Sequence, residues 1–383
     1  MSDFPLYALS EEHQAVREAV RAVCDAKVAP AAAQVDEAGE FPQAAYDALA
    51  ASDFAAPHVG EEYGGAGADA LATCIVIEEV ARACASSSLI PAVNKLGSMP
   101  VILAGSEELK KKYLSKLAAN DGMFSYCLSE PDAGSDAAAM KTKAVRDGDD
   151  WVINGQKTWT TLGQHGDWIF TLVRTDTEVK KQAGISMLLI DMTSPGVEVR
   201  PIELIDGGHE VNEVWFSDVR VPGDLLVGDL DGGWTIAKFL LGNERVGVAP
   251  VGATKRALAT LKSVAADRLD DPLVRARVAE LENDLLALEL TALRVVAHSS
   301  GGEPHPASSV LKLRGTELQQ AVSELALDLA GPASLAARAD DDSPQEGWAR
   351  RTAPTYLNLR KASIYGGSNE IQRQIIAKTI LGL

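Results

Sequence analysis

The residues whose types could do chemistry fall in four short stretches of this 383-residue chain. Two of them read YCLSEPDAGSD (residues 126–136) and WVINGQKTWTT (residues 151–161), and they combine hydroxyls, glycines and a tryptophan. The third reads IYGGSNEIQR (residues 364–373), and in the fourth Glu244 stands directly before Arg245. Each also has an ordinary explanation, because serines beside proline and glycine form turns, Trp159 suits a core strand, and Glu244 suits a helix surface. Their meaning depends on the elements that carry them.

Several common sites are disfavoured because their motifs are missing. No GxGxxG follows an expected strand and no GxxxxGK[ST] occurs, which argues against a doubly wound nucleotide-binding fold. A cofactor would therefore lie between domains. The cysteines include no CxxC pair and do not cluster with histidines, so we expect buried, reduced thiols and no metal site. The four are Cys24, Cys74, Cys84 and Cys127.

The excess of acidic residues argues against some classes of binding partner. Lys and Arg total 36 and Asp and Glu total 54, which gives a formal net charge of −18. So acidic a surface repels phosphate backbones and anionic lipid, which disfavours nucleic acid and membranes as partners. The first residues form no cationic and apolar leader, and no stretch approaches about 18 consecutive apolar residues. We therefore expect a cytoplasmic protein.

The stretches are carried by three zones of different periodicity. The first, residues 1–120, is predicted to be helical, with Ser10 as an N-cap and a helix limited by Pro30. A second, buried helix is expected over Asp69–Ser86, after a glycine-rich loop at residues 58–67. The third zone, residues 231–383, is predicted to be a bundle of amphipathic helices interrupted by an acidic loop over Ala339–Ala353.

The middle zone, residues 121–230, is predicted to be an antiparallel β domain. Its segments are short, rich in β-branched and aromatic residues, and bounded by turn formers. No helices separate them, and Asn154-Gly155 suggests a hairpin turn. The expected strands are Trp151–Asn154, Trp168–Arg174, Ile185–Asp191, Val197–Ile202 and Val211–Phe216. The fold class is therefore α+β, in the order helical domain, β domain, helical bundle.

Taken together, the stretches resemble the signatures of the acyl-CoA dehydrogenase family. The runs at 126–136, 151–161 and 364–373, and the glycine-rich loop around Tyr63, occur in the family's order across nearly the whole chain. The resemblance implies FAD as cofactor and α,β-dehydrogenation of an acyl-CoA thioester to the 2-enoyl-CoA. It implies FAD contacts at Tyr126, Leu128, Ser129, Ser135, Trp159, Thr161, Ser368 and Glu370. It also implies substrate contacts at Ser135, Arg245 and Tyr365.

The base that removes the α-proton has to be a carboxylate with a raised pKa. Many family members carry it directly after the tyrosine of the third signature, where this chain has Gly366. Long-chain and isovaleryl-type members instead carry a glutamate before an arginine, as in Glu244-Arg245. The resemblance therefore implies Glu244 as base, with Arg245 orienting it or holding the CoA portion. His209 is expected to support a loop.

Two departures from the family concern the far end of FAD. The Arg-x-x-Phe-Gly element is replaced by residues 266–272, ADRLDDP, and the Gln-containing Gly-Gly turn by residues 328–332, DLAGP. Residues 204–214, 239–245 and 360–373 look like the large subunit of heteromeric enzymes such as pimeloyl-CoA dehydrogenase. We therefore expect a homo-oligomer or a heteromer with a homologous chain, and an electron-transfer flavoprotein as electron acceptor. The alternatives are a non-catalytic subunit that completes another chain's FAD site, a flavin monooxygenase or nitroalkane-oxidase-like relative, and a cofactor-free scaffold.

Overall fold

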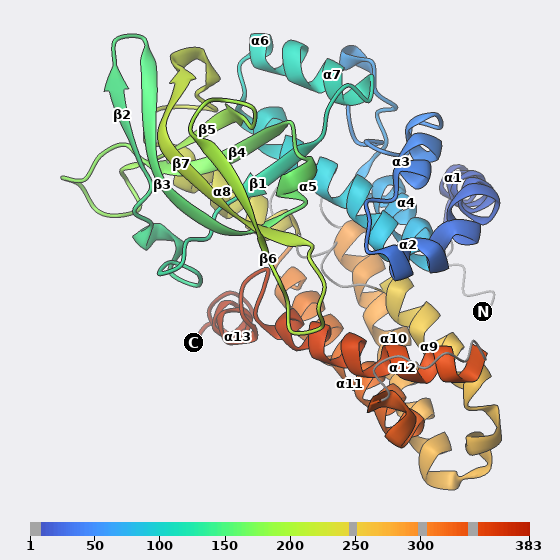
Figure 1. Cartoon of the computed structure of the whole chain (residues 1–383). Coiled ribbons are helices and arrows are strands. Elements are labelled where there is room, and N and C mark those ends of the chain that lie inside the picture. The colour runs from blue at the N-terminus through green and yellow to red at the C-terminus, as the bar shows by residue number, and fades with distance from the viewer. Residues whose placement is uncertain (1–8, 245–250, 298–304, 336–343) are drawn as a thin grey trace.

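The computed structural model describes residues 9–244, 251–297, 305–335 and 344–383. Helices come first, a seven-stranded sheet follows, and helices complete the chain, so the expected α+β class is confirmed. Figure 1 shows the sheet beside the first helices, with the last helices grouped at the other end of the molecule.

The first part of the chain is helical, as predicted. Ser10 caps α1, because its Oγ accepts a hydrogen bond from the backbone N–H of His13 at 3.2 Å. The α-helix ends at Val23, before Pro30, in agreement with the prediction that Pro30 limits it, although the chain does not leave the helical path there. A π-helical turn and a 3₁₀ turn carry the backbone past Pro30 into α2, because proline is tolerated in the first turn of a helix. The helices are α1 (Glu11–Val23), α2 (Ala32–Ala38), α3 (Gln43–Ala50), α4 (Ala70–Ala83), α5 (Leu89–Ala104), α6 (Glu107–Leu109) and α7 (Ser115–Ala118).

The sheet contains the five predicted strands and two that the sequence pattern missed, β1 and β2. Its order is β1-β4-β2-β3-β7-β6, with β5 paired to β4. The pairing is antiparallel except that β4 runs parallel to β1 and touches β2 in parallel at one residue pair. The strands are β1 (Phe124–Cys127), β2 (Lys143–Asp147), β3 (Asp150–Thr161), β4 (Trp168–Arg174), β5 (Ile185–Asp191), β6 (Val197–Ile202) and β7 (Val211–Pro222).

The predicted turn at Asn154-Gly155 is wrong, because these residues lie inside β3. The register against β7 shifts there, and Gly155 has a φ of 153°. A Cβ on Gly155 would come within 2.5 Å of Thr142 Oγ1, so the glycine serves a bulge and a close approach. The hairpin turn lies earlier, between the paired residues Asp147 and Asp150, with Gly148 at a φ of 63°.

The last helices divide between two bodies. The apolar residues of α8 belong to the same core as the sheet and α5, whereas α9, α10 and α11 form a separate apolar core. The acidic loop predicted over Ala339–Ala353 is helical from residue 344 onward, and residues 336–343 lie outside the described part. The helices are α8 (Gly233–Glu244), α9 (Val251–Val264), α10 (Pro272–Ala297), α11 (Ser308–Ala330), α12 (Pro344–Asn358) and α13 (Asn369–Thr379).

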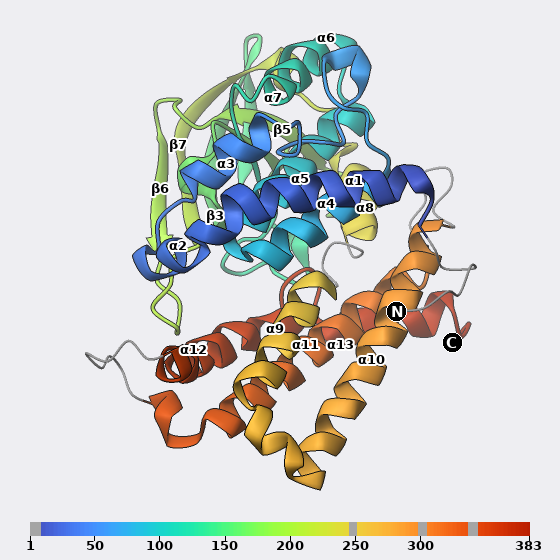
Figure 2. The same ribbon diagram turned by 90° about the vertical axis from the view of Figure 1, so that its right-hand side faces the viewer.

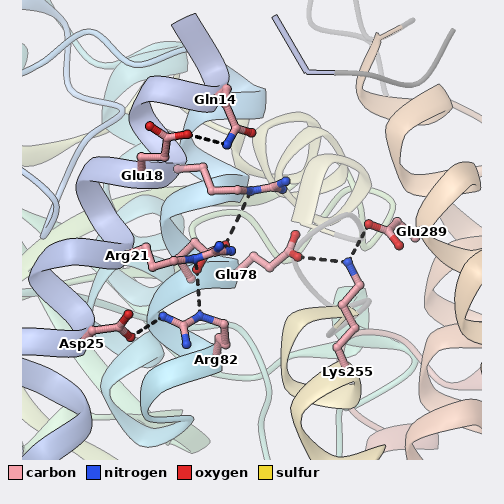
Figure 3. A network of polar contacts seen from close by, with 10 residues as sticks. Gln14, Glu18, Arg21, Asp25, Glu78, Arg82, Lys255 and Glu289 are labelled. Atoms are coloured by element: carbon pink, nitrogen blue, oxygen red, sulfur yellow. Dashed lines mark hydrogen bonds and ion pairs between the residues drawn. The ribbon is translucent and has the colours of Figure 1, made fainter. Parts of the chain in front are cut away.

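We call residues 9–244 the sheet body and helices α9–α13 the C-terminal bundle. Figure 2 shows the two side by side, with α9 near α4. Polar contacts join them at this point, because Lys255 of α9 lies 3.4 Å from Glu78 of α4 and 2.5 Å from Glu289 of α10 (Figure 3). Arg256 donates to the carbonyl oxygens of Arg82 and Ala83 at the end of α4.

Within the sheet body, a buried carboxylate joins α1 to α4. Glu79 is 3% exposed and accepts hydrogen bonds from Arg21 at 2.7 Å and from Arg82 at 2.8 Å. Burial alone would raise the pKa of Glu79, but the bonds from these guanidinium groups outweigh it and hold the pKa below its ordinary value.

No described helix is long and apolar enough to cross a membrane.

Candidate functional site

The first two signature stretches meet on the sheet. Ser129 follows β1, and its carbonyl oxygen accepts a hydrogen bond from the backbone N–H of Thr158 in β3 at 3.0 Å. Ser125 of β1 donates through Oγ to the carbonyl oxygen of Thr161 at 2.8 Å. The residues that the resemblance assigns to the flavin in these two stretches are therefore neighbours in space.

A second bulge in β3 turns Trp159 out of the sheet. The register against β7 shifts between Lys157 and Thr160, and Trp159 has a left-handed φ of 64°. Its side chain is 58% exposed, although the residues on either side of it are buried. Bulges often re-aim a side chain beside a functional site. A projecting indole on a buried strand is suited to cover one face of a planar ring.

The hydroxyls around Trp159 fit a flavin. Among the described residues, the side chains of Ser129, Ser135 and Thr161 have no hydrogen-bond partner. Ser129 and Thr161 are half-buried, and Ser135 is exposed. Hydroxyls both donate and accept, as the pyrimidine edge and N5 of a flavin require. The residues present therefore fit the expected cofactor.

Tyr126 and Leu128 lie at the end of β1, directly before Ser129. Tyr126 stacks on Phe170 with ring centroids 5.7 Å apart, and Leu128 is 8% exposed. The side chain of Leu128 is therefore packed in the core. Both residues fix the path of the chain into Ser129.

An ion pair that the sequence analysis did not single out lies directly behind this loop. Lys157 Nζ is 2.9 Å from Glu130 Oε1, and the two residues are 0% and 7% exposed. Glu130 also accepts hydrogen bonds from the backbone N–H groups of Lys141 at 2.6 Å and Thr142 at 2.9 Å. Both charged residues stand inside the recognised stretches, but their spacing gave no sign that they pair.

The third stretch forms a turn in the C-terminal bundle. Gly366 and Gly367 have φ of 62° and 80°, and Ser368 caps α13 by accepting from the backbone N–H of Ile371. Gln372 is fully buried and donates to the carbonyl oxygen of Gly367 at 3.1 Å. Tyr365 is 43% exposed, and the Glu370 side chain is 78% exposed.

A loop from the sheet body reaches this turn. The β6–β7 connection places Glu210 against Lys361, just before Tyr365. The carbonyl oxygen of Glu210 also accepts from the backbone N–H of Leu162, at the end of β3, at 3.1 Å. The second and third stretches are thus joined through Glu210, whereas within the described part of the chain no hydrogen bond or ion pair joins Ser368 or Glu370 to the sheet. In the same loop His209 bonds Asn212 at 2.9 Å, as a loop-supporting residue would.

The helix that carries the expected base belongs to the sheet body. Glu244 is the last residue of α8, and its side chain lies outside the described part, as does Arg245. A Cβ on Gly233 would be 2.6 Å from the carbonyl carbon of Ser186, so α8 begins pressed against β5. Packing against the sheet therefore fixes where α8, the helix that ends at Glu244, lies in the molecule.

The two elements that depart from the family lie in the C-terminal bundle. Residues 266–270 form a 3₁₀ helix between α9 and α10. Asp328, in the stretch that replaces the family's Gly-Gly turn, pairs with Arg277 at 2.8 Å. Among the described residues, no three His, Cys, Asp or Glu side chains group as a metal site.

Comparison with known proteins agrees with this architecture. Residues 10–121, 125–219 and 231–381 match the N-terminal, middle and C-terminal domains of acyl-CoA dehydrogenase. A curated relative, the probable acyl-CoA dehydrogenase FadE25 of Mycobacterium tuberculosis, is 39% identical over 99% of this chain and 97% of its own length.

Solved structures share the fold over their full length. A glutaryl-coenzyme A dehydrogenase with glutaryl-CoA has a TM-score of 0.88 at 26% identity, covering 100% of this chain and 97% of that chain. A chain of the ChsE4–ChsE5 complex of Mycobacterium tuberculosis has a TM-score of 0.85 at 29% identity, covering 98% of both chains.

Proposed function

Because this chain belongs to the acyl-CoA dehydrogenase family, we propose that it removes the α- and β-hydrogens of an acyl-CoA thioester and releases the 2-enoyl-CoA. Members of the family are FAD-dependent oxidoreductases, and FAD is the cofactor of this enzyme. The observation that carries the proposal is the exposed indole of Trp159 beside the unpaired hydroxyls of Ser129 and Thr161.

When bound, FAD supplies the acceptor for the β-hydrogen of the substrate. In the proposed site Trp159 would cover the ring, and the hydroxyls of Ser129 and Thr161 would hold its polar edge. Ser135 lies on the exposed side of the same loop, where it is placed to meet the CoA thioester. Tyr365 would approach from the C-terminal bundle, and Ser368 and Glu370 would contact the cofactor from the start of α13.

Glu244 is the proposed base, with Arg245 beside it. The support is positional, since α8 packs against the sheet that carries the flavin stretches and ends at Glu244. At the position that many relatives use, Gly366 offers no side chain and has a φ of 62°. A carboxylate there would carry a conformational strain that glycine avoids. The α-proton of the substrate would pass to Glu244 as the β-hydrogen leaves as a hydride.

The test is the visible spectrum of the purified protein, recorded without oxygen before and after adding acyl-CoAs of different chain length. We expect a yellow protein with non-covalent FAD whose absorbance bleaches, with enoyl-CoA as product. Protein that neither contains FAD nor takes it up would contradict the proposal. Rapid reoxidation by air would instead indicate the monooxygenase or nitroalkane-oxidase-like reaction, and reoxidation by electron-transfer flavoprotein the dehydrogenase reaction.

A second candidate function is that of one subunit in a mixed assembly. The replacement of the Phe-Gly element by residues 266–272 and of the Gln-containing Gly-Gly turn by residues 328–332 favours it, because those elements hold the far end of FAD in other family members. A two-chain relative, the ChsE4–ChsE5 complex, has the same fold. We expect fewer than one FAD per chain, or association with a homologous chain, when molar mass and flavin content are measured together. A homo-oligomer with one tightly held FAD per chain and full activity would contradict it.

A further inference from the structure

Glu130 and Lys157 lie inside the two flavin stretches, next to the backbone hydrogen bond that joins these stretches. Glu130 directly follows Ser129, and Lys157 directly precedes Thr158, whose N–H bonds the carbonyl oxygen of Ser129. Successive Cα atoms are about 3.8 Å apart. The pair is therefore close to the residues proposed for the flavin, yet it is shielded from water.

Lys157 is surrounded by acceptors. Its Nζ lies 2.9 Å from Glu130 Oε1, 3.4 Å from Met140 Sδ and 3.5 Å from the carbonyl oxygen of Leu128. An ammonium group has three donors and no acceptor. These surroundings suit the charged form. Burial lowers the pKa of Lys157, and the carboxylate of Glu130 opposes that effect.

Glu130 is held as a carboxylate. Burial would raise its pKa, but the charge of Lys157 and the hydrogen bonds from residues 141 and 142 outweigh burial and lower it. A carboxylate that accepts two backbone N–H groups and one ammonium is stabilised in its ionised form.

Arg174 adds a second buried cation to this group. It is 8% exposed and donates to the carbonyl oxygens of Ala138 at 2.6 Å and Met140 at 3.4 Å. Arg174 also donates to the carbonyl oxygen of Lys181, and all these partners are neutral. The one carboxylate that acts on Arg174 is Glu130, which is shared with Lys157. The nearby Asp136 is exposed and is paired with Lys181. Within the described part of the chain, the buried group Glu130–Lys157–Arg174 carries two positive charges and one negative charge.

We propose that the Glu130–Lys157–Arg174 group tunes the reduction potential of the bound flavin. The inference rests on the proposed function. The substrate gives its α-hydrogen to Glu244 as a proton and its β-hydrogen to FAD as a hydride. The hydride carries two electrons and one negative charge, so the cofactor becomes more negative on reduction. A buried net positive charge is poorly screened and stabilises that negative charge. These residues act through the field they create, without touching the substrate.

Opposite charge changes should move the potential in opposite directions. Glu130→Gln leaves two positive charges and is expected to raise the potential. Lys157→Met leaves no net charge and is expected to lower it. The double variant restores the wild-type net charge and is expected to return the potential toward wild type. We expect each single change to alter the equilibrium constant for two-electron reduction at least tenfold, which corresponds to about 30 mV.

The measurement is redox titration of the FAD-loaded protein against an indicator dye, which needs no turnover. Glu198→Gln and Arg200→Met remove an exposed ion pair of the same sheet and should leave the potential unchanged. Shifts in the same direction for Glu130→Gln and Lys157→Met, or none, would overturn the proposal. A purely structural role predicts such a common direction.

Removing one partner of a buried ion pair leaves an uncompensated buried charge, so the single variants risk unfolding. Arg174→Met covers that case, because it removes one charge and leaves the ion pair intact. We expect it to lower the potential as Lys157→Met does, and an unchanged potential would overturn the inference. Protein that never binds FAD would instead refute the proposed function.

Discussion

The sheet body and the C-terminal bundle hold their parts of the site by different means. In the sheet body a single apolar core joins the sheet, α5 and α8, so the flavin stretches and the helix that ends at Glu244 are packed together. The bundle has its own core and meets the sheet body through ion pairs such as Lys361–Glu210 and Lys255–Glu78. A base on α8 is therefore fixed relative to the flavin by packing, whereas a base at Gly366 would depend on these polar contacts.

Acid should weaken the sheet body through His58. Its Nε2 bonds Ser98 at 2.7 Å, its Nδ1 is buried without a partner, and burial lowers its pKa from 6.5 to about 3. Below pH 6.5 the unfolded chain binds a proton that the folded chain refuses, so stability falls as the pH falls. The loss approaches about 1.4 kcal/mol per pH unit. Denaturant unfolding at pH 7 and pH 5 measures it.

The control for this pH effect is His58→Gln. Its stability should fall less steeply between pH 6.5 and pH 5, where most carboxylates remain ionised. His165, whose pKa is also lowered by burial, contributes in the same direction and remains in both proteins. Equal slopes for wild type and variant would contradict the account of His58.

Gly97→Val should damage the contact between α5 and β1. A Cβ at Gly97 would lie 2.7 Å from Phe124 Cβ and 2.9 Å from its carbonyl carbon, and backbone cannot move aside easily. Overpacking of this kind costs about 1–3 kcal/mol, and we expect the upper end. Thermal unfolding measures it. Gly347→Ala, in α12, meets nothing within 4 Å and serves as the control, with no loss expected.

Gly366→Ala tests the turn of the bundle. With a φ of 62°, any side chain strains the backbone, and the expected loss of stability is about 1 kcal/mol. Flavin bleaching by substrate should persist, because the proposed base is elsewhere. Bleaching abolished in a folded, FAD-loaded variant would indicate that the turn, rather than α8, controls the chemistry.

Changes to the ion pair Lys361–Glu210, which joins the sheet body to the C-terminal bundle, should have the smallest effect on stability. Lys361 and Glu210 are partly exposed, so exchanging their charges through Glu210→Lys with Lys361→Glu should restore most of what either change removes. Exposed pairs contribute at most about 1 kcal/mol and weaken in salt. A double-mutant cycle in low and high salt measures the coupling. A coupling energy that persists in high salt would contradict the view that this ion pair is exposed to solvent.

Much of this architecture follows from local pattern. Strands β4, β5 and β6 have the predicted bounds, because their β-branched runs end at clear turn residues. Strand β1 was missed because half of it, Tyr126 and Cys127, falls within the first signature stretch, and β2 because most of its residues are exposed. Asn154-Gly155 has the composition of a turn. It forms a bulge because β3 continues through it in pairing with β7, and Thr142 packs closely against Gly155.

The site could be predicted as far as recognised motifs reach. The segments that carry Ser129 and Trp159 are joined by a backbone hydrogen bond, but their roles toward a flavin stay predictions, and the exposure of Trp159 depends on a bulge set by pairing with β7. Glu130 and Lys157 are 27 positions apart, so their pairing depends on how β1 and β3 pack. The assignment of Glu244 and Arg245 remains a prediction, because their side chains lie outside the described residues.

The most direct test of the central claim is the rate of anaerobic flavin reduction in Glu244→Gln. The oxidised variant is mixed rapidly with an acyl-CoA that bleaches the wild type, and the flavin absorbance is recorded. The variant keeps the shape of the side chain and removes the proton acceptor. Glu280→Gln, an exposed glutamate of α10, is the matched control and should react as wild type. We predict that Glu244→Gln still binds FAD and acyl-CoA but reduces the flavin about 10²–10⁴-fold more slowly. Reduction at the wild-type rate would contradict the assignment of Glu244 as the base.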